Sequence, residues 1–104
     1  MKKRFRLTPE ARADLREILL DIATDSPDAA ERLRLEFYEA LQRLAQTPGI
    51  GHYHEELLDG RYRFWNFYSY VVCYLWQKKP IQIIAVVHGA RDLAAFLATR
   101  AGSD

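Results

Sequence analysis

Two helix-start signals stand close together in the first third of the chain and fix its local architecture. Thr8-Pro9 and Ser26-Pro27 each combine a hydroxyl side chain that can cap free N–H groups with a proline suited to a first helical turn. The first helix is therefore predicted to begin after Thr8 and to end near Thr24, and the second to begin after Ser26. Because only one or two residues separate the two helices, they must fold back on each other as an antiparallel hairpin.

Both predicted helices carry an apolar stripe with the spacing of one helix face, which indicates that each packs against a core. Pro48 and Gly49 end the second helix, and residues 48–60 are predicted to form a loop. The stripe of the first helix comprises Ala11, Leu15, Ile18, Leu19 and Ile22, and that of the second comprises Ala30, Leu33, Phe37, Leu41 and Leu44.

The pattern changes to that of strands after Gly60. Residues 61–66, 70–77 and 81–88 are rich in aromatic and β-branched side chains and are separated by short breaks, which favours an antiparallel meander of three strands. Residues 4–7 alternate charged and apolar side chains, as a half-buried N-terminal strand does.

A short C-terminal helix is predicted after the last strand, with Asp92 as its cap and with Leu93, Phe96 and Leu97 as its apolar side chains. The expected fold is therefore α+β: an N-terminal strand, an antiparallel two-helix hairpin packed on a small antiparallel sheet, and this short helix. A chain of 104 residues is expected to form a single domain, residues 1–104.

The composition argues against several classes of protein. The lone Cys73 cannot form an internal disulfide. The sequence has neither a long apolar run nor a signal-peptide pattern, so we expect a cytoplasmic protein that does not span a membrane. His52 and His54 stand beside Glu55 and Glu56, but this spacing lacks the distant further ligand of a zinc site. We expect no metal and no cofactor.

Charge is distributed unevenly, although the formal net charge is only +1. Between Glu10 and Asp59 the chain has 12 acidic and 5 basic residues, a net charge of −7 that leaves +8 for the two flanking segments. The predicted helices are thus acidic and the predicted strands basic. The basic side could approach an acidic partner or nucleic acid; alternatively, the carboxylates only solvate the helices.

The two central predicted strands are apolar on both faces, which is unusual for an antiparallel sheet. In strict alternation, Ile81, Ile83, Ala85 and Val87 would share one face of the last strand, opposite Ile84 and Val86. A helical hairpin covers only one face of a sheet, so the second face must be closed by the C-terminal helix, by Leu57 and Leu58 of the loop, or by another chain. We expect this face to leave a docking surface for a protein partner.

Four stretches of the chain, in order and spacing, carry a resemblance to a known family. They are RLTPEA at residues 6–11, TPGIG at 47–51, YVVCY at 70–74 and VVHGARDL at 86–93. Over residues 4–97 the chain resembles the ParE branch of the ParE/RelE superfamily, the toxin halves of bacterial toxin–antitoxin pairs. The resemblance implies the RelE/ParE-like fold and a toxin of the kind associated with plasmid stabilisation.

The resemblance also implies a protein partner. Toxins of this family are held inactive by a cognate antitoxin, here expected to be ParD-like, whose disordered segment folds onto the toxin beside the helical hairpin and along the sheet. By that analogy the antitoxin would contact the outer parts of Leu19, Phe37 and Tyr38.

Inhibition of DNA gyrase is the activity characteristic of the ParE branch, so the resemblance implies gyrase as the target. Arg61, Arg63 and Arg91 are expected on the target-facing side, because a rigid turn beside a sheet can present charge with little loss of freedom on binding. No specific contact with nucleic acid is expected.

A ribosome-dependent mRNA endonuclease of the RelE type is the alternative function. It would use His88, Arg91, Arg63 and Arg61 as catalytic residues, with the hydroxyl of Tyr70 nearby. The acidic residues of the 48–60 loop would repel an RNA backbone, so we expect no catalytic residues. A non-toxic protein-interaction module on the same fold is the third possibility.

Overall fold

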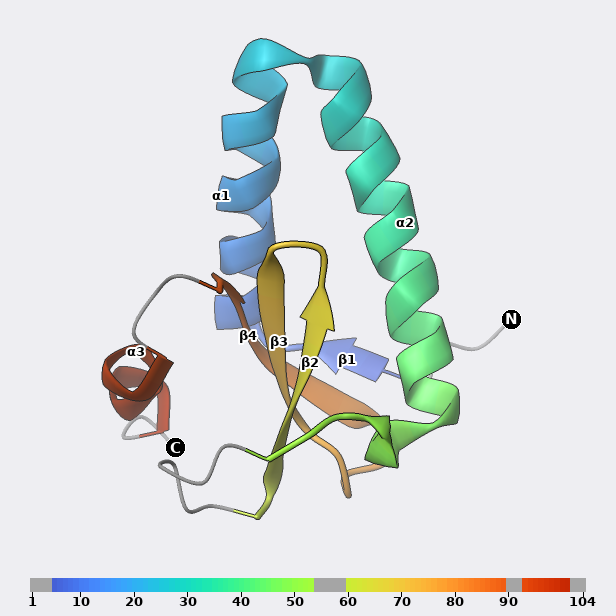
Figure 1. The fold of residues 1–104 in the computed structure, drawn as a ribbon, viewed down its shortest axis with the longest axis vertical. Coiled ribbons are helices and arrows are strands. Elements are labelled where there is room, and N and C mark those ends of the chain that lie inside the picture. Colours follow the sequence, from blue (N-terminus) through green and yellow to red (C-terminus); the bar gives the residue numbers. More distant parts are fainter. Residues whose placement is uncertain (1–4, 54–59, 90–92, 102–104) are drawn as a thin grey trace.

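The computed structural model describes residues 5–53, 60–89 and 93–101 and has an α+β architecture, with a helical hairpin lying across one face of a twisted sheet (Figure 1). The sheet has four strands in the order β1-β4-β3-β2. The elements are β1 (Phe5–Leu7), α1 (Pro9–Asp25), α2 (Pro27–Gln46), the short 3-10 helix η1 (Pro48–Ile50), β2 (Tyr62–Phe67), β3 (Tyr70–Leu75), β4 (Ile81–His88) and α3 (Leu93–Ala101).

The two predicted helix caps, Thr8 and Ser26, are confirmed by their hydrogen bonds. The hydroxyl of Thr8 accepts a hydrogen bond from the N–H of Ala11 at 3.1 Å, and that of Ser26 accepts one from the N–H of Ala29 at 3.1 Å. The N–H of Ser26 also donates to the carbonyl of Ile22 at 2.9 Å, so this one residue both ends α1 and begins α2. A connection this short leaves the two helices only the antiparallel arrangement.

The prediction of a three-stranded antiparallel sheet is wrong, because the N-terminal strand joins the sheet and pairs in parallel. Phe5 to Leu7 of β1 lie beside Ile81 to Ile83 of β4, whereas β2, β3 and β4 form the antiparallel meander. The helical hairpin connects β1 at one edge of the sheet to β2 at the other edge, and the meander then brings β4 back beside β1, so the long connection that parallel neighbours require comprises both. The sheet is therefore mixed.

The main core lies between the hairpin and the sheet. Ala11 and Leu15 of the stripe on α1 and Phe37, Leu41 and Leu44 of the stripe on α2 are buried in this core. Burying one leucine- or phenylalanine-sized side chain contributes about 1.5 to 3 kcal/mol to folding. Its buried members are Phe5, Leu7, Ala11, Leu15, Phe37, Leu41, Leu44, Val72, Tyr74, Ile81, Ile83 and Val86.

The second face of the sheet is covered by the chain itself, so the expected docking surface for a partner is not left open there. Leu93 and Phe96 of α3 pack against a buried cluster whose members are 9% exposed or less. Asp92 and the side chain of Leu97, named for the same helix, lie outside the described residues, as do Leu57 and Leu58. The members of this second cluster are Phe64, Val71, Cys73, Ala85 and Val87.

A β-bulge in β4 explains how two apolar faces are built from one strand. Cys73 pairs with Ala85, but the next residue, Tyr74, pairs with Ile83, so Ile84 is an extra residue on β4. The bulge reverses the alternation of side chains: Ile83 and the later Val86 both join the core under the hairpin, whereas Ala85 joins the second cluster. Strict alternation along this strand, which the sequence suggested, is therefore wrong.

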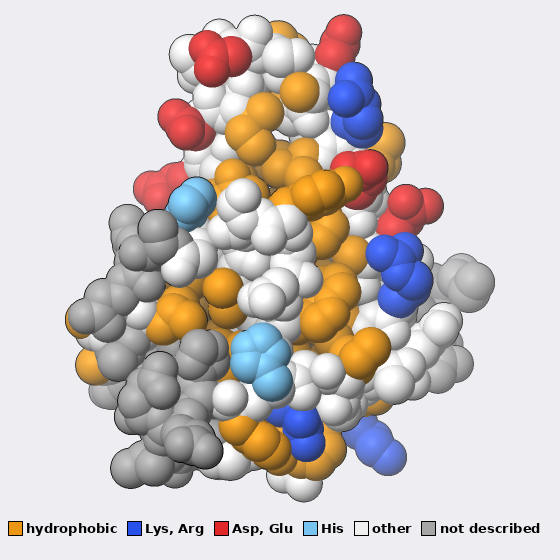
Figure 2. Space-filling model, in the orientation of Figure 1, with side chains coloured by type: hydrophobic (Ala, Val, Ile, Leu, Met, Phe, Trp, Pro, Cys, Tyr) orange, Lys and Arg blue, Asp and Glu red, His pale blue; other side chains and the backbone are white. Residues whose placement is uncertain are grey.

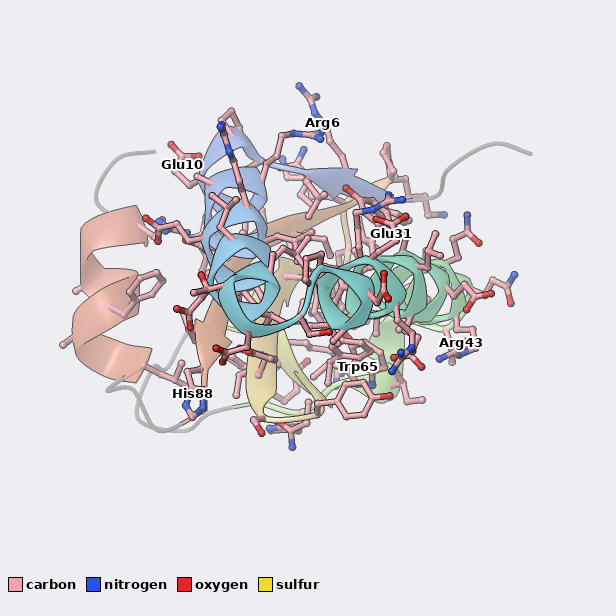
Figure 3. All side chains as sticks on the ribbon, turned by 90° about the horizontal axis from the view of Figure 1, so that it is seen from above. Arg6, Glu10, Glu31, Arg43, Trp65 and His88 are labelled. Atoms are coloured by element: carbon pink, nitrogen blue, oxygen red, sulfur yellow. The ribbon has the colours of Figure 1, made fainter. Side chains whose placement is uncertain are left out.

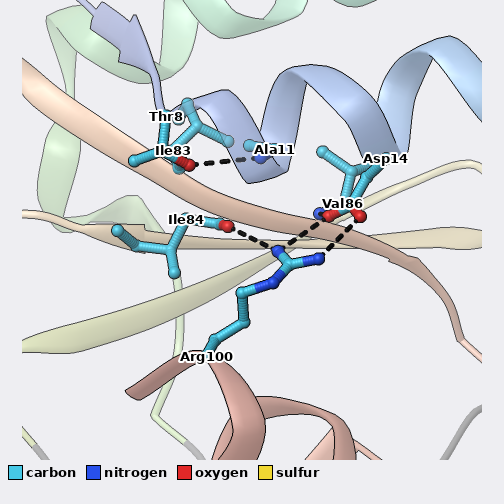
Figure 4. A network of polar contacts seen from close by, with 7 residues as sticks. All are labelled: Thr8, Ala11, Asp14, Ile83, Ile84, Val86 and Arg100. Carbon is cyan, nitrogen blue, oxygen red and sulfur yellow. Dashed lines mark hydrogen bonds and ion pairs between the residues drawn. The ribbon is translucent and has the colours of Figure 1, made fainter. Parts of the chain in front are cut away.

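Beyond the bulge, backbone N–H and carbonyl groups on the outer edge of β4 form hydrogen bonds with two charged side chains instead of with a neighbouring strand (Figure 4). Asp14 of α1 accepts a hydrogen bond from the N–H of Val86 at 3.0 Å. Arg100 of α3 donates to the carbonyl of Ile84 at 2.9 Å and to both carboxylate oxygens of Asp14 at 2.8 and 3.0 Å. This network connects α1, β4 and α3, elements that are far apart in the sequence.

We expect Asp14→Ala and Arg100→Ala each to lower the free energy of unfolding by about 1 to 3 kcal/mol, since either change leaves a partly buried charge and a backbone group without a partner. The two side chains are only 13% and 17% exposed. Chemical denaturation of the purified variants measures the effect.

Arg34→Ala is the matched control, because the Glu31–Arg34 pair on α2 is 58% and 43% exposed and such pairs contribute about 0 to 1 kcal/mol. Equal losses in the variants of the two ion pairs would contradict the structural role given to Asp14 and Arg100.

Candidate functional site

Helix α1 carries its acidic and basic side chains on different flanks, which a count of charges does not reveal. Arg12 and Arg16 lie one turn apart, on the same side of the helix. Four acidic residues follow each other at spacings of four, three and four positions and so form a separate stripe. This stripe comprises Glu10, Asp14, Glu17 and Asp21.

A groove runs between α1 and α2 and is bordered by the arginine flank of α1. It encloses about 370 Å³ and is lined by Leu19, Leu20 and Ala23 of α1 and by Tyr38 of α2, among others. Two of the residues expected to contact an antitoxin, Leu19 and Tyr38, are thus brought together. The third, Phe37, is 1% exposed and lies in the core.

A second hollow of about 740 Å³ adjoins this groove on the outer side of α1 and reaches Arg6 of β1. The two hollows share Arg12, Arg16 and Leu20, which therefore form a ridge between them. Viewed along the hairpin, Arg6 lies on one flank of the molecule, and Trp65 and His88 lie on the other (Figure 3).

The flank on the side of β2 exposes aromatic side chains. Trp65 stacks on Phe67 with ring centroids 6.3 Å apart, and Tyr68 packs its ring against Phe67 at 4.8 Å. Tyr68 is 69% exposed and has a left-handed backbone with φ of 53°, which is uncommon for a residue other than glycine. A band of apolar side chains also crosses this face of the molecule in Figure 2.

The hydroxyl of Tyr68 donates a hydrogen bond to Glu36 of α2 at 3.1 Å, and this bond raises the pKa of the Tyr68 phenol. The contact ties the β2–β3 turn to the hairpin. No sequence pattern marks a tyrosine that adopts a left-handed backbone, so the contact between Tyr68 and Glu36 could not be predicted.

Arg63, which was expected to face a target, instead contacts other residues of this chain. The central carbon of its guanidinium lies 4.2 Å from the ring centroids of both Tyr53 and Trp76. The guanidinium donates hydrogen bonds to the carbonyl of Gly51 at 2.7 Å and to the hydroxyl of Tyr53 at 3.0 Å. Arg63 therefore positions the segment that follows η1. Arg61 is exposed, and its guanidinium lies 5.4 Å from the ring centroid of Tyr62.

Two of the candidate catalytic residues of the alternative function, His88 and Arg63, lie apart in the sheet. His88 pairs with Tyr70 at one end of β3, and their rings meet edge to face at 5.7 Å. Arg63 pairs with Tyr74, four residues further along β3, a distance of about 13 Å along the strand. The fourth candidate, Arg91, lies outside the described residues.

Tyr74 connects the sheet to η1 from inside the core. Its hydroxyl donates to the carbonyl of Pro48 at 2.6 Å and accepts from the N–H of Gly51 at 3.0 Å. A Cβ atom on Gly51 would lie 2.5 Å from that hydroxyl and 2.9 Å from the carbonyl of Phe64, so only glycine fits here without rearrangement. Burial raises the pKa of the Tyr74 phenol, although the Gly51 N–H acts in the opposite direction.

We expect stability to fall with rising pH above about pH 10, where an unfolded tyrosine ionises, because the raised folded pKa of Tyr74 favours the neutral phenol. Thermal unfolding measured between pH 8 and about pH 11 tests this. Tyr74→Phe removes the titrating group and should lose stability at neutral pH but flatten the alkaline decline. An equally steep decline in Tyr74→Phe would contradict the assignment.

The described part of the chain contains neither a candidate metal cluster nor a candidate membrane-spanning helix. Residues 5–53, 60–89 and 93–101 contain no group of three or more His, Cys, Asp or Glu side chains that could hold a metal ion. No helix within these ranges has the length and apolar character needed to cross a membrane. His54, Glu55 and Glu56, considered for a metal site above, lie outside them.

A family model described as the ParE toxin of type II toxin–antitoxin system, parDE, matches residues 5–93. The match includes β1, the hairpin and the three strands of the meander, and it ends at the first residue of α3. No match to a curated protein was found.

Proposed function

The chain belongs to the ParE toxin family of type II toxin–antitoxin systems, and from this premise we propose that it inhibits DNA gyrase when free and is neutralised by a ParD-like antitoxin. The observation that carries the proposal is the family match, which spans all the elements from β1 to β4. The resemblance of four separate stretches to the ParE branch supports the same conclusion. Because gyrase acts on chromosomal DNA, the toxin would act in the cytoplasm.

The antitoxin is proposed to bind along the α1–α2 groove. Leu19 and Tyr38 line this groove, and Leu20 beside them is 60% exposed, so apolar surface is available to a partner. Phe37 supports the groove from the core, where it packs against Phe67 with ring centroids 5.1 Å apart. The second face of the sheet is excluded as the main docking surface because α3 already covers it.

The side that faces the target is proposed to include Arg61, with Arg63 acting as the residue that holds the neighbouring segment in place and Arg91 as a further contact. Residues 60–89, which form the meander, contain Arg61, Arg63, Lys78 and Lys79 but no acidic residue. All the acidic residues in the described part of the chain lie on α1 and α2. This separation of charge would orient the toxin toward an acidic target.

We further propose that the toxin is not an enzyme. Cleavage of mRNA requires a group that takes up a proton and groups that stabilise the phosphate, all close to the same bond. The separation between Arg63 and His88 along the sheet argues against such an arrangement.

Two assays on the purified free protein test the proposed function. We expect the protein to inhibit gyrase or to accumulate gyrase–DNA cleavage complexes, and not to cut mRNA on programmed ribosomes. Arg61→Glu should weaken the effect on gyrase because it reverses an exposed charge, whereas Arg43→Glu on α2 is the matched control and should not.

Cutting of mRNA that disappears in His88→Ala would contradict the proposal and establish the alternative endonuclease. Activity in neither assay, from a protein that remains folded by circular dichroism, would favour a non-toxic interaction module on the same fold.

A further inference from the structure

We propose that the hollow on the outer side of α1 is a binding site for a small polyphosphate anion, held by Arg6, Arg12 and Arg16. The hollow encloses about 740 Å³, and pockets for small ligands typically enclose roughly 300 to 1,000 Å³. It is separate from the groove between α1 and α2, although Arg12 and Arg16 border both. The proposal follows from the side chains of the hollow and does not rest on the proposed function.

Two different elements bring the three arginines to this hollow. Arg6 lies on β1, and its side chain projects outward from the strand (Figure 3). Arg12 and Arg16 lie one turn apart on α1, about 6 Å along the helix axis. Among the described residues that line the hollow, Glu17 is the one acidic side chain. Three arginines and one glutamate give the lining a net charge of +2.

The guanidinium groups of these three arginines have no partner in the described part of the chain. All three side chains are exposed, and none of them forms a hydrogen bond or an ion pair with a described residue. By contrast, Arg34 binds Glu31 and Arg100 binds Asp14. A guanidinium group carries five N–H donors in a planar fork that matches the oxygens of a phosphate group. The hollow therefore offers three such forks to an anion.

A ligand with several negative charges suits this arrangement better than a ligand with one. A single contact with an exposed guanidinium group contributes little, because water and salt screen it. Three contacts with one compact anion add up, since the ligand loses its freedom of motion only once. The hollow also reaches Pro9, the first residue of α1, where the helix dipole favours negative charge.

The rest of α1 disfavours a long polyanion such as duplex DNA. The helix carries five acidic and two basic residues, and both basic residues line the hollow. A duplex that extends beyond the hollow would meet the carboxylates of Glu10, Asp14 and Asp21, which repel its backbone. A small anion that stays within the hollow meets mainly the arginines. The apolar part of the lining, which includes Pro9 and Ala13, provides surface that can pack against a nucleoside.

Isothermal titration calorimetry of the full-length protein tests the site with four probes: ATP, inorganic tripolyphosphate, AMP and adenosine. The buffer contains neither phosphate nor divalent cations, which would compete for the site or for the probes. We expect ATP and tripolyphosphate to bind at least about tenfold more tightly than AMP, and adenosine not to bind. The affinities should fall as the salt concentration rises. The tighter of the first two probes shows whether the site prefers a nucleotide or an inorganic polyphosphate.

Arg6→Gln, Arg12→Gln and Arg16→Gln should each weaken the binding of ATP by about three- to tenfold, because each removes one charged contact. Glutamine supports a helix almost as well as arginine, so the helical variants should remain folded by circular dichroism. The matched control, Arg32→Gln with Arg43→Gln, removes two positive charges from α2 at positions that line neither hollow. This control should keep the affinity for ATP.

Nuclear magnetic resonance of the unaltered protein locates the ligand without any variant. ATP should shift the side-chain N–H signals of Arg6, Arg12 and Arg16 and leave those of Arg32 and Arg43 in place. Signals that shift equally in both groups would overturn the proposal.

Equal binding of ATP and AMP, or equal losses in the hollow and control variants, would also overturn it. So would binding of duplex DNA at the same arginines that neither ATP nor tripolyphosphate displaces. Neither gyrase nor an antitoxin takes part in these measurements, so failure of the proposed function leaves their outcome unchanged.

Discussion

The arrangement of this fold depends on the hydrogen bonds that the outer edge of β4 forms beyond the end of the short strand β1. Only three residues of β1 pair with β4, and the bulge at Ile84 lies just past them. Asp14 and Arg100 take the place of a longer strand by binding the N–H of Val86 and the carbonyl of Ile84. Because these two side chains come from α1 and α3, the same network positions helices on opposite faces of the sheet.

Closure of the second face by α3 restricts where a partner can bind. A sheet that is apolar on both faces would expose a large apolar surface on its second face if only the hairpin covered it. Among the described residues, large apolar side chains remain exposed on the flanks of the hairpin, as at Leu20 and Tyr68, and also after its end, at Ile50 and Tyr53. One flank carries the arginine-bordered groove, and the other carries the aromatic side chains from Trp65 to Tyr68. The proposed function needs one surface for an antitoxin and another for a target, and these two flanks differ in chemistry.

Much of the fold could be predicted from the sequence because the signals were local. Thr8 and Ser26 each cap a helix through their own side chains, and the number of residues between the helices leaves one arrangement. The parallel pairing of β1 could not be predicted, because it depends on which distant strand the hairpin brings beside it. The bulge at Ile84 could not be predicted either, since its residues are as apolar as those of a regular strand.

The site was less accessible to sequence reasoning, for two different reasons. The sorting of charge on α1 is visible in the sequence, but only when the positions of Arg12 and Arg16 are compared with those of the acidic stripe and not when charges are summed. The role of Arg63 depends on Tyr53 and Trp76, which are far from it in the chain and become neighbours only in the folded sheet. Charge alone therefore suggested a contact with a target, whereas the structure shows a contact within the chain.

Hydrogen exchange of backbone amides in Arg100→Ala tests most directly whether the Asp14–Arg100 network holds α3 against the sheet. This role of the network predicts faster exchange at Val86 and in the part of β4 next to α3, with the hairpin amides of α1 and α2 as protected as in the unaltered protein. Unchanged protection at Val86 and along β4 would contradict it, because α3 would then be held by its apolar contacts alone.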